Sequence, residues 1–341
     1  MKKKLVSFLV GCLLISCVEK VKYEAPVFTE RIPENVRILN DDYIFKYGDN
    51  PMLVDSLLIV STFNDDQQIA VFNRNSGRLL KDFGKKGPAP FELVTPTAFS
   101  VDKLEQILYV SDIGKQSLLS YDLREVINEN MIIPVPIKTS QEFMKRSLVR
   151  FLRDSLYFAP AHKDGRILVG VPMEIQYVID SKTPDSNKFP TQEDWYNYMN
   201  MQSVMVVRPD GHYLAAGSSL GGILEVFDLN SDNKERVVLK HFYEPIFKKK
   251  GHVVRPIPET IGGFSYLAAT DKFLYATLHG KANPNSMPSS ICKFDWKGNP
   301  IERYDCGKYS ICSFVVSEDD RTVYAVAVDG DGEQILLEIH L

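Results

Sequence analysis

One pattern recurs six times along the chain and constrains its fold more than any other feature of the sequence. Each copy is an acidic turn followed by a short run of apolar and aromatic residues, which is typical of a β-strand. The central residues of these runs are Ile59, Tyr109, Tyr157, Tyr213, Tyr275 and Tyr324. Their spacings lie between 48 and 62 residues, which is at or slightly above the repeat of about 40 to 50 residues that forms one blade of a β-propeller.

Three further strand-like runs belong to each copy. An apolar run such as Phe264–Ala268 precedes the acidic turn, and a third run follows that often ends in an aromatic residue and Asp or Asn, as at Phe227-Asp228. A turn and a fourth run, such as Ile301–Tyr304, complete the unit. Because four strands per repeat are the blade of a β-propeller, we predict an all-β fold, a six-bladed β-propeller with four-stranded blades.

The two ends of the chain predict how the ring closes. The last repeat ends at Leu341 within its third strand, so its own fourth strand is absent. Residues 36–47 precede the first repeat and are free to supply that strand. Such a closure hides both sheet edges, which would otherwise invite aggregation. We therefore predict a propeller domain over residues 36–341, with the last blade closed by an N-terminal strand.

The N-terminus is typical of an exported lipoprotein. Lys2–Lys4 are followed by an apolar run, Leu5 to Ile15, which is shorter than the approximately 20 residues of a membrane-spanning helix and typical of a signal peptide. Leu14-Ile15-Ser16-Cys17 resembles a bacterial lipobox, in which the cysteine is acylated and becomes the N-terminus. The alternative is an ordinary cleaved signal peptide with an incidental cysteine.

From this pattern we predict a signal peptide over residues 1–16, lipidation of Cys17 and a lipidated tether over residues 17–35. Val18 is not the aspartate that retains lipoproteins in the inner membrane of some bacteria, so we expect the outer membrane of the cell envelope. The sequence leaves open whether the domain faces the periplasm or the cell surface.

The charge of the chain and its cysteines bear on two separate questions, its partners and its disulfide bonds. A net charge of −4 gives no electrostatic reason to expect nucleic acid as a partner. Three cysteines besides Cys17 remain in the mature chain, and an exported chain meets an oxidising compartment. Cys292 with Cys306, Cys306 with Cys312, and free buried thiols remain equally open.

The candidate binding residues lie on long connections. In a four-stranded blade, the second-to-third and fourth-to-next-first connections emerge on one face, and most of the excess length falls there, as in Glu244 to Gly263. Long loops on one face of a rigid scaffold are common binding sites. The candidate ligand-binding residues are Lys86, Phe91, His162, Lys163, Trp195, His252, Arg255 and His279. Alternatively, Trp195 packs against the blades and the basic residues form a solvated face.

Metal binding and catalysis receive little support from the sequence. Asp329, Asp331 and Glu333 resemble a fragment of a calcium loop without the full set of ligands, and Asp-Gly is also a common turn dipeptide. No cofactor is predicted, although calcium at these three acids stays open. No motif for a nucleophile, a zinc protease or a phosphate-binding loop is present, so no catalytic residue is assigned.

A family resemblance rests on three segments. Phe83-Gly-Lys-Lys-Gly-Pro-Ala-Pro-Phe91, Leu108–Asp112 and Tyr121-Asp-Leu123 resemble the BF3164-like lipoproteins of Bacteroides-type bacteria, in the TolB-like group of six-bladed propellers. The commoner loop of that family reads Gly-Pro-Gly-Glu-Phe, where this chain has Ala89-Pro90. The resemblance implies the fold and an envelope location, and it implies no catalytic residues.

Together these features predict an envelope-anchored lipoprotein. Its propeller is expected to be a non-enzymatic binding module for a peptide, a glycan or a protein partner. The alternative is a metal-dependent hydrolase or lactonase-like propeller enzyme, which needs inward carboxylates that meet at the central channel. A structural subunit of an envelope complex is a third hypothesis.

Overall fold

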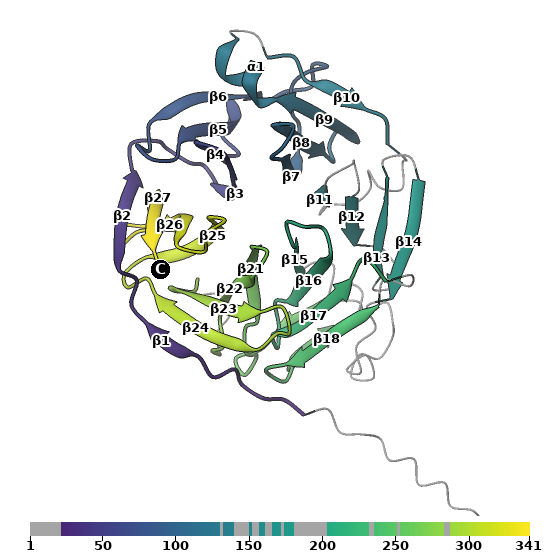
Figure 1. The fold of residues 1–341 in the computed structure, drawn as a ribbon, viewed down its shortest axis with the longest axis vertical. Coiled ribbons are helices and arrows are strands. Elements are labelled where there is room, and N and C mark those ends of the chain that lie inside the picture. Colours follow the sequence, from purple (N-terminus) through teal and green to yellow (C-terminus); the bar gives the residue numbers. More distant parts are fainter. Residues whose placement is uncertain are drawn as a thin grey trace, which may run out of the picture.

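The computed structural model describes residues 22–129, 132–139, 150–151, 157–160, 166–171, 174–180, 203–231, 235–250, 253–282 and 287–341. Antiparallel sheets stand radially around a common axis, and the chain passes from one sheet to the next around a ring (Figure 1). The predicted all-β propeller is confirmed. No helix in the described part of the chain is long and apolar enough to span a membrane.

Five sheets of the ring are four-stranded blades. Four of them are formed by β3 (Asp49–Val54), β4 (Leu57–Ser61), β5 (Gln67–Asn73) and β6 (Leu79–Lys85); by β7 (Pro96–Asp102), β8 (Ile107–Asp112), β9 (Ser117–Asp122) and β10 (Val135–Ile137); by β11 (Arg150–Phe151), β12 (Tyr157–Pro160), β13 (Arg166–Val171) and β14 (Glu174–Asp180); and by β15 (Ser203–Val207), β16 (Tyr213–Ser218), β17 (Ile223–Asp228) and β18 (Arg236–His241). The fifth contains β25 (Ser310–Val316), β26 (Thr322–Val328), β27 (Gln334–His340) and β2 (Asn35–Asn40).

The prediction of six four-stranded blades is wrong. The sheet of β21 (Phe264–Ala269), β22 (Phe273–Leu278), β23 (Ser290–Asp295) and β24 (Pro300–Asp305) has a fifth strand, so the structure has five four-stranded blades and one five-stranded sheet. The added strand is β1 (Thr29–Arg31), which runs parallel to β24 on its outer edge. All three residues of β1 are exposed, so no apolar pattern marked this strand in the sequence.

The described part of the predicted tether, which begins at residue 22, contacts the propeller. The backbone N–H of Glu24 donates to the carbonyl of His241 at 2.9 Å, and the ring of Phe28 packs edge-on against Phe294 at 5.2 Å. Ion pairs from Arg31 to Glu302 (3.1 Å) and from Arg303 to Glu30 (2.7 Å) flank β1. This segment therefore lies along two neighbouring sheets before it reaches β2. The boundaries 1–16, 17–35 and 36–341 stay a prediction.

The closing strand lies where the sequence predicted it. β2 pairs antiparallel with β27, from Asn35 opposite His340 to Asn40 opposite Leu336. Leu39 of β2 is 7% exposed and shares a core cluster with Leu58 of the first blade and Tyr324 of the last. The N-terminal strand therefore joins the two ends of the ring.

The repeated acidic turns connect neighbouring sheets. Asp320, between β25 and β26, accepts hydrogen bonds from the hydroxyls of Tyr275 (3.2 Å) and Thr270 (2.6 Å) in the preceding sheet. Asp55, between β3 and β4, likewise accepts from the side-chain amide of Gln106 in the next blade at 2.8 Å. The recurring residue of each copy lies on the second strand of its sheet, and Tyr275 is fully buried there.

One helix and one hairpin interrupt the blade pattern within the described residues. α1 (Leu123–Asn128) follows β9, and the carboxylate of Asp122 caps it by accepting the N–H of Arg124 at 2.9 Å. β19 (Phe247–Lys250) and β20 (Val253–Pro256) form a separate two-stranded sheet in the connection from β18 to β21.

Three of the predicted long connections, those after β6, before β21 and after β22, are described well enough to place, and they lie on one side of the ring, as predicted. The N–H of Lys86, at the start of the β6–β7 connection, donates to the carbonyl of Asp66 in the β4–β5 connection at 2.9 Å. The N–H of Gly262, before β21, donates to the carbonyl of Lys281, after β22, at 3.0 Å. We call this side of the ring, where first strands begin, the loop side.

The closing strand allows a matched stability test. Replacement of the buried Leu39 by alanine is expected to lower the free energy of unfolding by about 2–4 kcal/mol, because it leaves a cavity between the first and last blades. Ile38→Ala removes a similar side chain that is 44% exposed, and a loss below about 1 kcal/mol is expected. Urea unfolding of the two variants measures both. Equal losses would show that β2 does not close the core.

Candidate functional site

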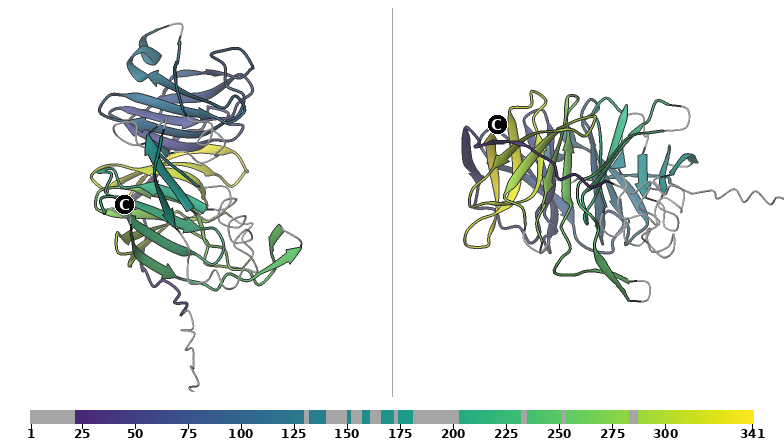
Figure 2. Two further views of the ribbon diagram at one scale, coloured as in Figure 1. Left: turned by 90° about the vertical axis from the view of Figure 1, so that its right-hand side faces the viewer. Right: turned by 90° about the horizontal axis from the view of Figure 1, so that it is seen from below.

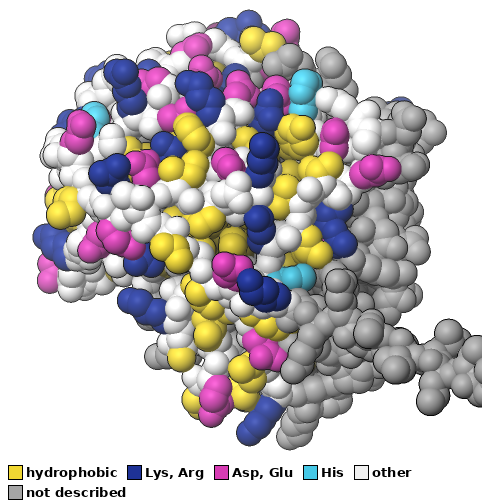
Figure 3. Space-filling view, turned by 60° about the horizontal axis from the view of Figure 1, so that its bottom comes forward, with side chains coloured by type: hydrophobic (Ala, Val, Ile, Leu, Met, Phe, Trp, Pro, Cys, Tyr) yellow, Lys and Arg dark blue, Asp and Glu magenta, His cyan; other side chains and the backbone are white. Residues whose placement is uncertain are grey.

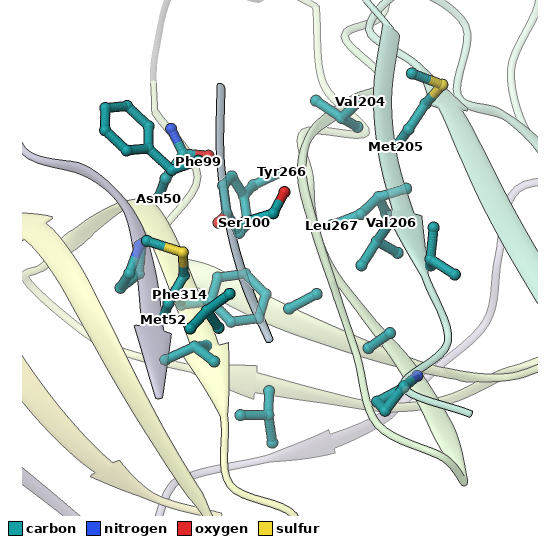
Figure 4. A pocket seen from close by; sticks show the side chains of 18 of the residues that line it. Asn50, Met52, Phe99, Ser100, Val204, Met205, Val206, Tyr266, Leu267 and Phe314 are labelled. Atoms are coloured by element: carbon teal, nitrogen blue, oxygen red, sulfur yellow. The ribbon is translucent and has the colours of Figure 1, made fainter. Parts of the chain in front are cut away.

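A cavity of about 690 Å³ lies at the centre of the propeller. Residues of the first strands of five sheets line it: β3, β7, β15, β21 and β25 (Figure 4). Since these strands come from positions between 49 and 316 of the chain, the cavity exists only when the ring is assembled. It is the central channel of the propeller.

The middle of the channel is apolar. Met52, Phe99, Val206, Leu267 and Phe314 line this part, one from each of the five strands (Figure 4). Phe99 and Phe314 are almost completely buried. Such a surface favours an apolar portion of a ligand and provides no hydrogen bonds from these side chains.

Bulges near the start of four first strands place other residues in the channel. The pairing of first and second strands is irregular between Asp49 and Met52, between Pro96 and Ala98, between Phe264 and Tyr266, and between Ile311 and Ser313. The residues within these irregularities all line the channel, and they are Asn50, Pro51, Thr97, Ser265 and Cys312. A bulge redirects a side chain away from the regular alternation of the strand. Four strands therefore present Asn50, Thr97, Ser265 and Cys312 at the loop-side end of the channel, which we call the bulge mouth.

The polar groups of the bulge mouth are neutral, apart from the Asp49 carboxylate. The side-chain amide of Asn50 donates to the carboxylate of Asp49 at 2.9 Å, and Asn50 has a left-handed backbone with φ of 48°. The hydroxyl of Ser265 lies 2.7 Å from that of Thr277. The Thr97 hydroxyl is buried without a hydrogen-bond partner among the described residues, and such a group is usually satisfied by water or a ligand.

The two other ionisable groups of the mouth are held in their protonated forms. Burial raises the pKa of the Cys312 thiol, while the amide of Gln334, 3.6 Å from its sulfur, acts in the opposite direction. Burial and the nearby carboxylate of Asp49 raise the pKa of the Tyr47 phenol. Thiol and phenol are therefore hydrogen-bond donors at neutral pH, and neither is an activated nucleophile.

The opposite end of the channel carries four acids, Asp102, Asp210, Asp271 and Glu318. Three of them have partners that stabilise the turns. Asp102 accepts the N–H groups of Leu104 and Glu105 in its own turn, and Asp210 lies 2.5 Å from the guanidinium of Arg208. Glu318 pairs with Lys103 at 2.9 Å, which lowers the pKa of this carboxyl group. Among the described residues, no group of three or more His, Cys, Asp or Glu is arranged to hold a metal ion.

None of the predicted binding residues with a described side chain lines the channel. Lys86 and Phe91 lie in the loop-side connection before β7, where the ammonium group of Lys86 is 2.7 Å from Asp65 and Phe91 is 49% exposed. His279 follows β22, and its N–H donates to the carbonyl of Gly263 at 3.0 Å. These three residues are on the predicted side of the ring but outside the cavity.

The other predicted residues are placed less fully. Arg255 lies in β20, and only its backbone is described. Cys17, His162, Lys163, Trp195 and His252 lie outside the described residues.

The predicted calcium-loop residues form the turn between β26 and β27. The carboxylate of Asp329 accepts the N–H groups of Asp331 (2.9 Å) and Glu333 (3.0 Å). The N–H of Asp329 in turn donates to the carbonyl of Glu333 at 3.0 Å. These bonds give the Asp-Gly sequence a structural role as a hairpin turn.

All three cysteines in the described residues are free. Cys292 faces Arg303 across the β23–β24 hairpin rather than Cys306. Burial raises the pKa of both the Cys292 and the Cys306 thiol to about 12. Cys312 is partly exposed at the bulge mouth.

The bulge mouth is not among the sites predicted from the sequence. Its signal was a polar residue or thiol near the start of an otherwise apolar first strand, as at Thr97, Ser265 and Cys312. In an alignment of the six first strands, these residues occupy equivalent positions near the start of the strand. Whether they face the channel depends on the bulges, which the sequence does not show.

Radial antiparallel sheets with a ligand-sized central channel define the protein as a β-propeller with a candidate binding channel. The chain belongs to the family described as TolB-like 6-blade propeller-like, which matches residues 27–319. No curated protein matches the sequence.

Solved structures share the fold at low sequence identity. A "Putative exported protein" from Bacteroides fragilis has a TM-score of 0.58 and 13% identity over 93% of this chain and 99% of its own. U3-55K has a TM-score of 0.53 and 12% identity over 91% of this chain and 100% of its own. The structure of the RRP9 WD40 repeats has a TM-score of 0.53 and 10% identity over 91% of this chain and 99% of its own.

Thiol reactivity tests the position of Cys312. In the folded protein with Cys17→Ser, iodoacetamide is expected to modify Cys312 while Cys292 and Cys306 are protected until unfolding. The raised thiol pKa leaves little thiolate at about pH 8, so the rate is expected to be lower than for free cysteine and to increase with pH beyond about 9. Peptide mass spectrometry identifies the modified residue. Modification of Cys292 in the folded protein, or none at Cys312, would contradict the structure.

Proposed function

We propose that the protein is a lipid-anchored envelope protein whose propeller binds an extended ligand, a peptide or a glycan, at the bulge mouth. The observation that carries this proposal is the repeated bulge at the start of four first strands. A bulge interrupts the hydrogen-bond ladder, and bulges are frequent beside functional sites. Four equivalent bulges that direct side chains into one cavity support a role beyond the stability of the sheets.

The chemistry of the channel favours binding over catalysis. The raised pKa values of Cys312 and Tyr47 keep these groups protonated, whereas a nucleophile requires deprotonation. Hydroxyl, amide and phenol groups at the rim are suited to hydrogen bonds with neutral polar groups. The apolar interior then suits a side chain or the apolar face of a sugar.

The dimensions agree with a small or narrow ligand. The volume of about 690 Å³ lies within the approximate range of 300–1,000 Å³ for ligand pockets. Tyr47 and Phe63 have ring centroids 5.9 Å apart, and Phe63 and Phe99 are 6.3 Å apart. Only Tyr47 and Phe99 of these three line the channel, so Phe63 supports two aromatic rings that are available to a ligand.

The envelope location rests on the N-terminal sequence. The basic start, the short apolar run and the lipobox-like Leu14–Cys17 support export, acylation of Cys17 and an outer-membrane location. The resemblance to BF3164-like lipoproteins belongs to the same proposal. The fold shared with the "Putative exported protein" from Bacteroides fragilis is consistent with it.

A blocking variant tests the binding site. Ser265 is exposed in the bulge mouth, so a Ser265→Trp side chain is expected to fill it. Peptidoglycan fragments, envelope oligosaccharides and short peptides are screened by thermal unfolding, where a ligand at a hundredfold excess over Kd stabilises the folded state by about 2.7 kcal/mol. The stabilising ligand is expected to act on the wild type and to lose its effect on Ser265→Trp.

Val237→Trp is the matched control, because it places the same side chain on the outer strand β18, where Val237 is 51% exposed. It is expected to respond as the wild type does. An unchanged response of Ser265→Trp would place binding elsewhere and overturn the proposed site.

A further inference from the structure

A two-stranded arm projects from the propeller. β19 and β20 pair only with each other among the described strands, with Phe247 opposite Pro256 and Lys248 opposite Arg255. The arm extends beyond the body of the ring in both side views (Figure 2). It belongs to the β18–β21 connection and therefore leaves from the loop side. An isolated two-stranded hairpin gains little stability by itself in water, so its retention calls for another role.

The base of the arm is fixed to the blades. The hydroxyl of Thr260, which is fully buried, donates to the carbonyl of Ile246 and accepts the N–H of Ile257. The N–H of Tyr243 donates to the carbonyl of Gly221 at 2.8 Å. The N–H of Gly221 in turn donates to the carbonyl of Ile261 at 3.0 Å, so both ends of the connection that carries the arm are bonded to the β16–β17 connection, while Thr260 joins the two ends to each other.

The charge of the arm is of one sign. Residues 247–256 include Lys248, Lys249, Lys250 and Arg255 and no acid, and Lys248 is exposed. On the face shown in Figure 3, basic and acidic side chains are intermixed, and the whole chain has a net charge of −4. The arm is therefore a local cationic element on an acidic protein.

The N-terminal segment docks beside the base of this arm. The ring of Tyr23 lies 5.9 Å from that of His241, and the N–H of Glu24 donates to the His241 carbonyl. His241 ends β18, and the arm begins six residues later at Phe247. Five residues separate Cys17 from Tyr23, so the six steps between them span at most about 22 Å. An acylated Cys17 would hold this part of the propeller close to the bilayer.

We propose that the β19–β20 arm is a second membrane contact, which binds the anionic phosphate headgroups of the bilayer that holds the lipid anchor. Lysine and arginine side chains near an anionic surface are attracted electrostatically. The arm and the anchor segment then hold the propeller at two points of one edge. Because the arm leaves from the loop side, the bulge mouth faces towards the membrane surface.

This inference rests on the proposed lipid anchor for its biological setting, but its test does not require lipidation or a channel ligand. The mature chain with Cys17→Ser is mixed with vesicles of phosphatidylcholine alone or with added phosphatidylglycerol, at about 0.1 M salt, where surface charges still interact over about 10 Å. Co-sedimentation is expected only with the anionic vesicles and is expected to weaken as salt increases.

Charge reversal separates the arm from the overall charge. Lys248→Glu with Lys250→Glu is expected to lower partitioning by at least about 25-fold, since each lost cation costs about fivefold. Lys297→Glu with Lys308→Glu changes the net charge equally at exposed sites outside the arm and is expected to retain most of the binding. Because glutamate keeps the edge strands of the arm charged, this variant is not expected to aggregate. A decrease in its co-sedimentation therefore reports weaker binding to the vesicles.

Three outcomes would overturn the proposal. These are no binding of the parent protein to anionic vesicles, equal binding to phosphatidylcholine, and equal losses in the two charge-reversal variants. Failure of the channel-blocking test would leave this result unchanged, so the two proposals fail separately.

Discussion

The pairing of β2 with β27 is the interaction on which the rest of the structure depends. It places a strand from residues 35–40 in the same sheet as the last strand of the chain. Leu39, Leu58 and Tyr324 then share one core cluster, so the first and last blades pack directly against each other. The channel and the bulge mouth require a closed ring, and this pairing joins its two ends by backbone hydrogen bonds in addition to the packing of their side chains.

Inside the closed ring, an irregularity of the sheets generates the candidate site. Regular strands would alternate residues between the two faces of each blade. The bulges at Asn50, Thr97, Ser265 and Cys312 change that alternation at the loop-side end of four first strands. The side chains of the candidate site therefore come from the inner strands rather than from loops, and ordered strands hold a ligand with a smaller loss of conformational entropy than loops do.

The N-terminal segment and the arm together suggest how this site is presented. β1 and the described residues before it lie against the outside of the ring, so part of the predicted tether of residues 17–35 is bound to the propeller. If Cys17 is acylated as proposed, this contact restricts the orientations of the propeller relative to the membrane. In the same proposal, the cationic arm restricts them further and turns the bulge mouth to the membrane side.

The sequence by itself determined the all-β architecture, the order of the strands and the closure by an N-terminal strand. These features follow from local patterns, because runs of β-branched and aromatic residues between turn residues specify strands wherever they occur. The recurring residues from Ile59 to Tyr324 all lie on second strands as this pattern requires. The third strands end at Asn73, Asp122, Asp228 and Asp295, at the aromatic-Asp or aromatic-Asn pairs.

Only the tertiary structure decided the features that depend on a partner strand. All three residues of β1 are exposed. It became the fifth strand of its sheet because the outer edge of β24 was available for pairing, and no apolar pattern in the sequence marked it. Cys292 meets Arg303 instead of Cys306 because of the register of β23 on β24. The bulges likewise exist only relative to the neighbouring strand. Strand pairing and register bring together residues that are distant in sequence. Local sequence patterns specify each strand but not which strand it pairs with or in which register.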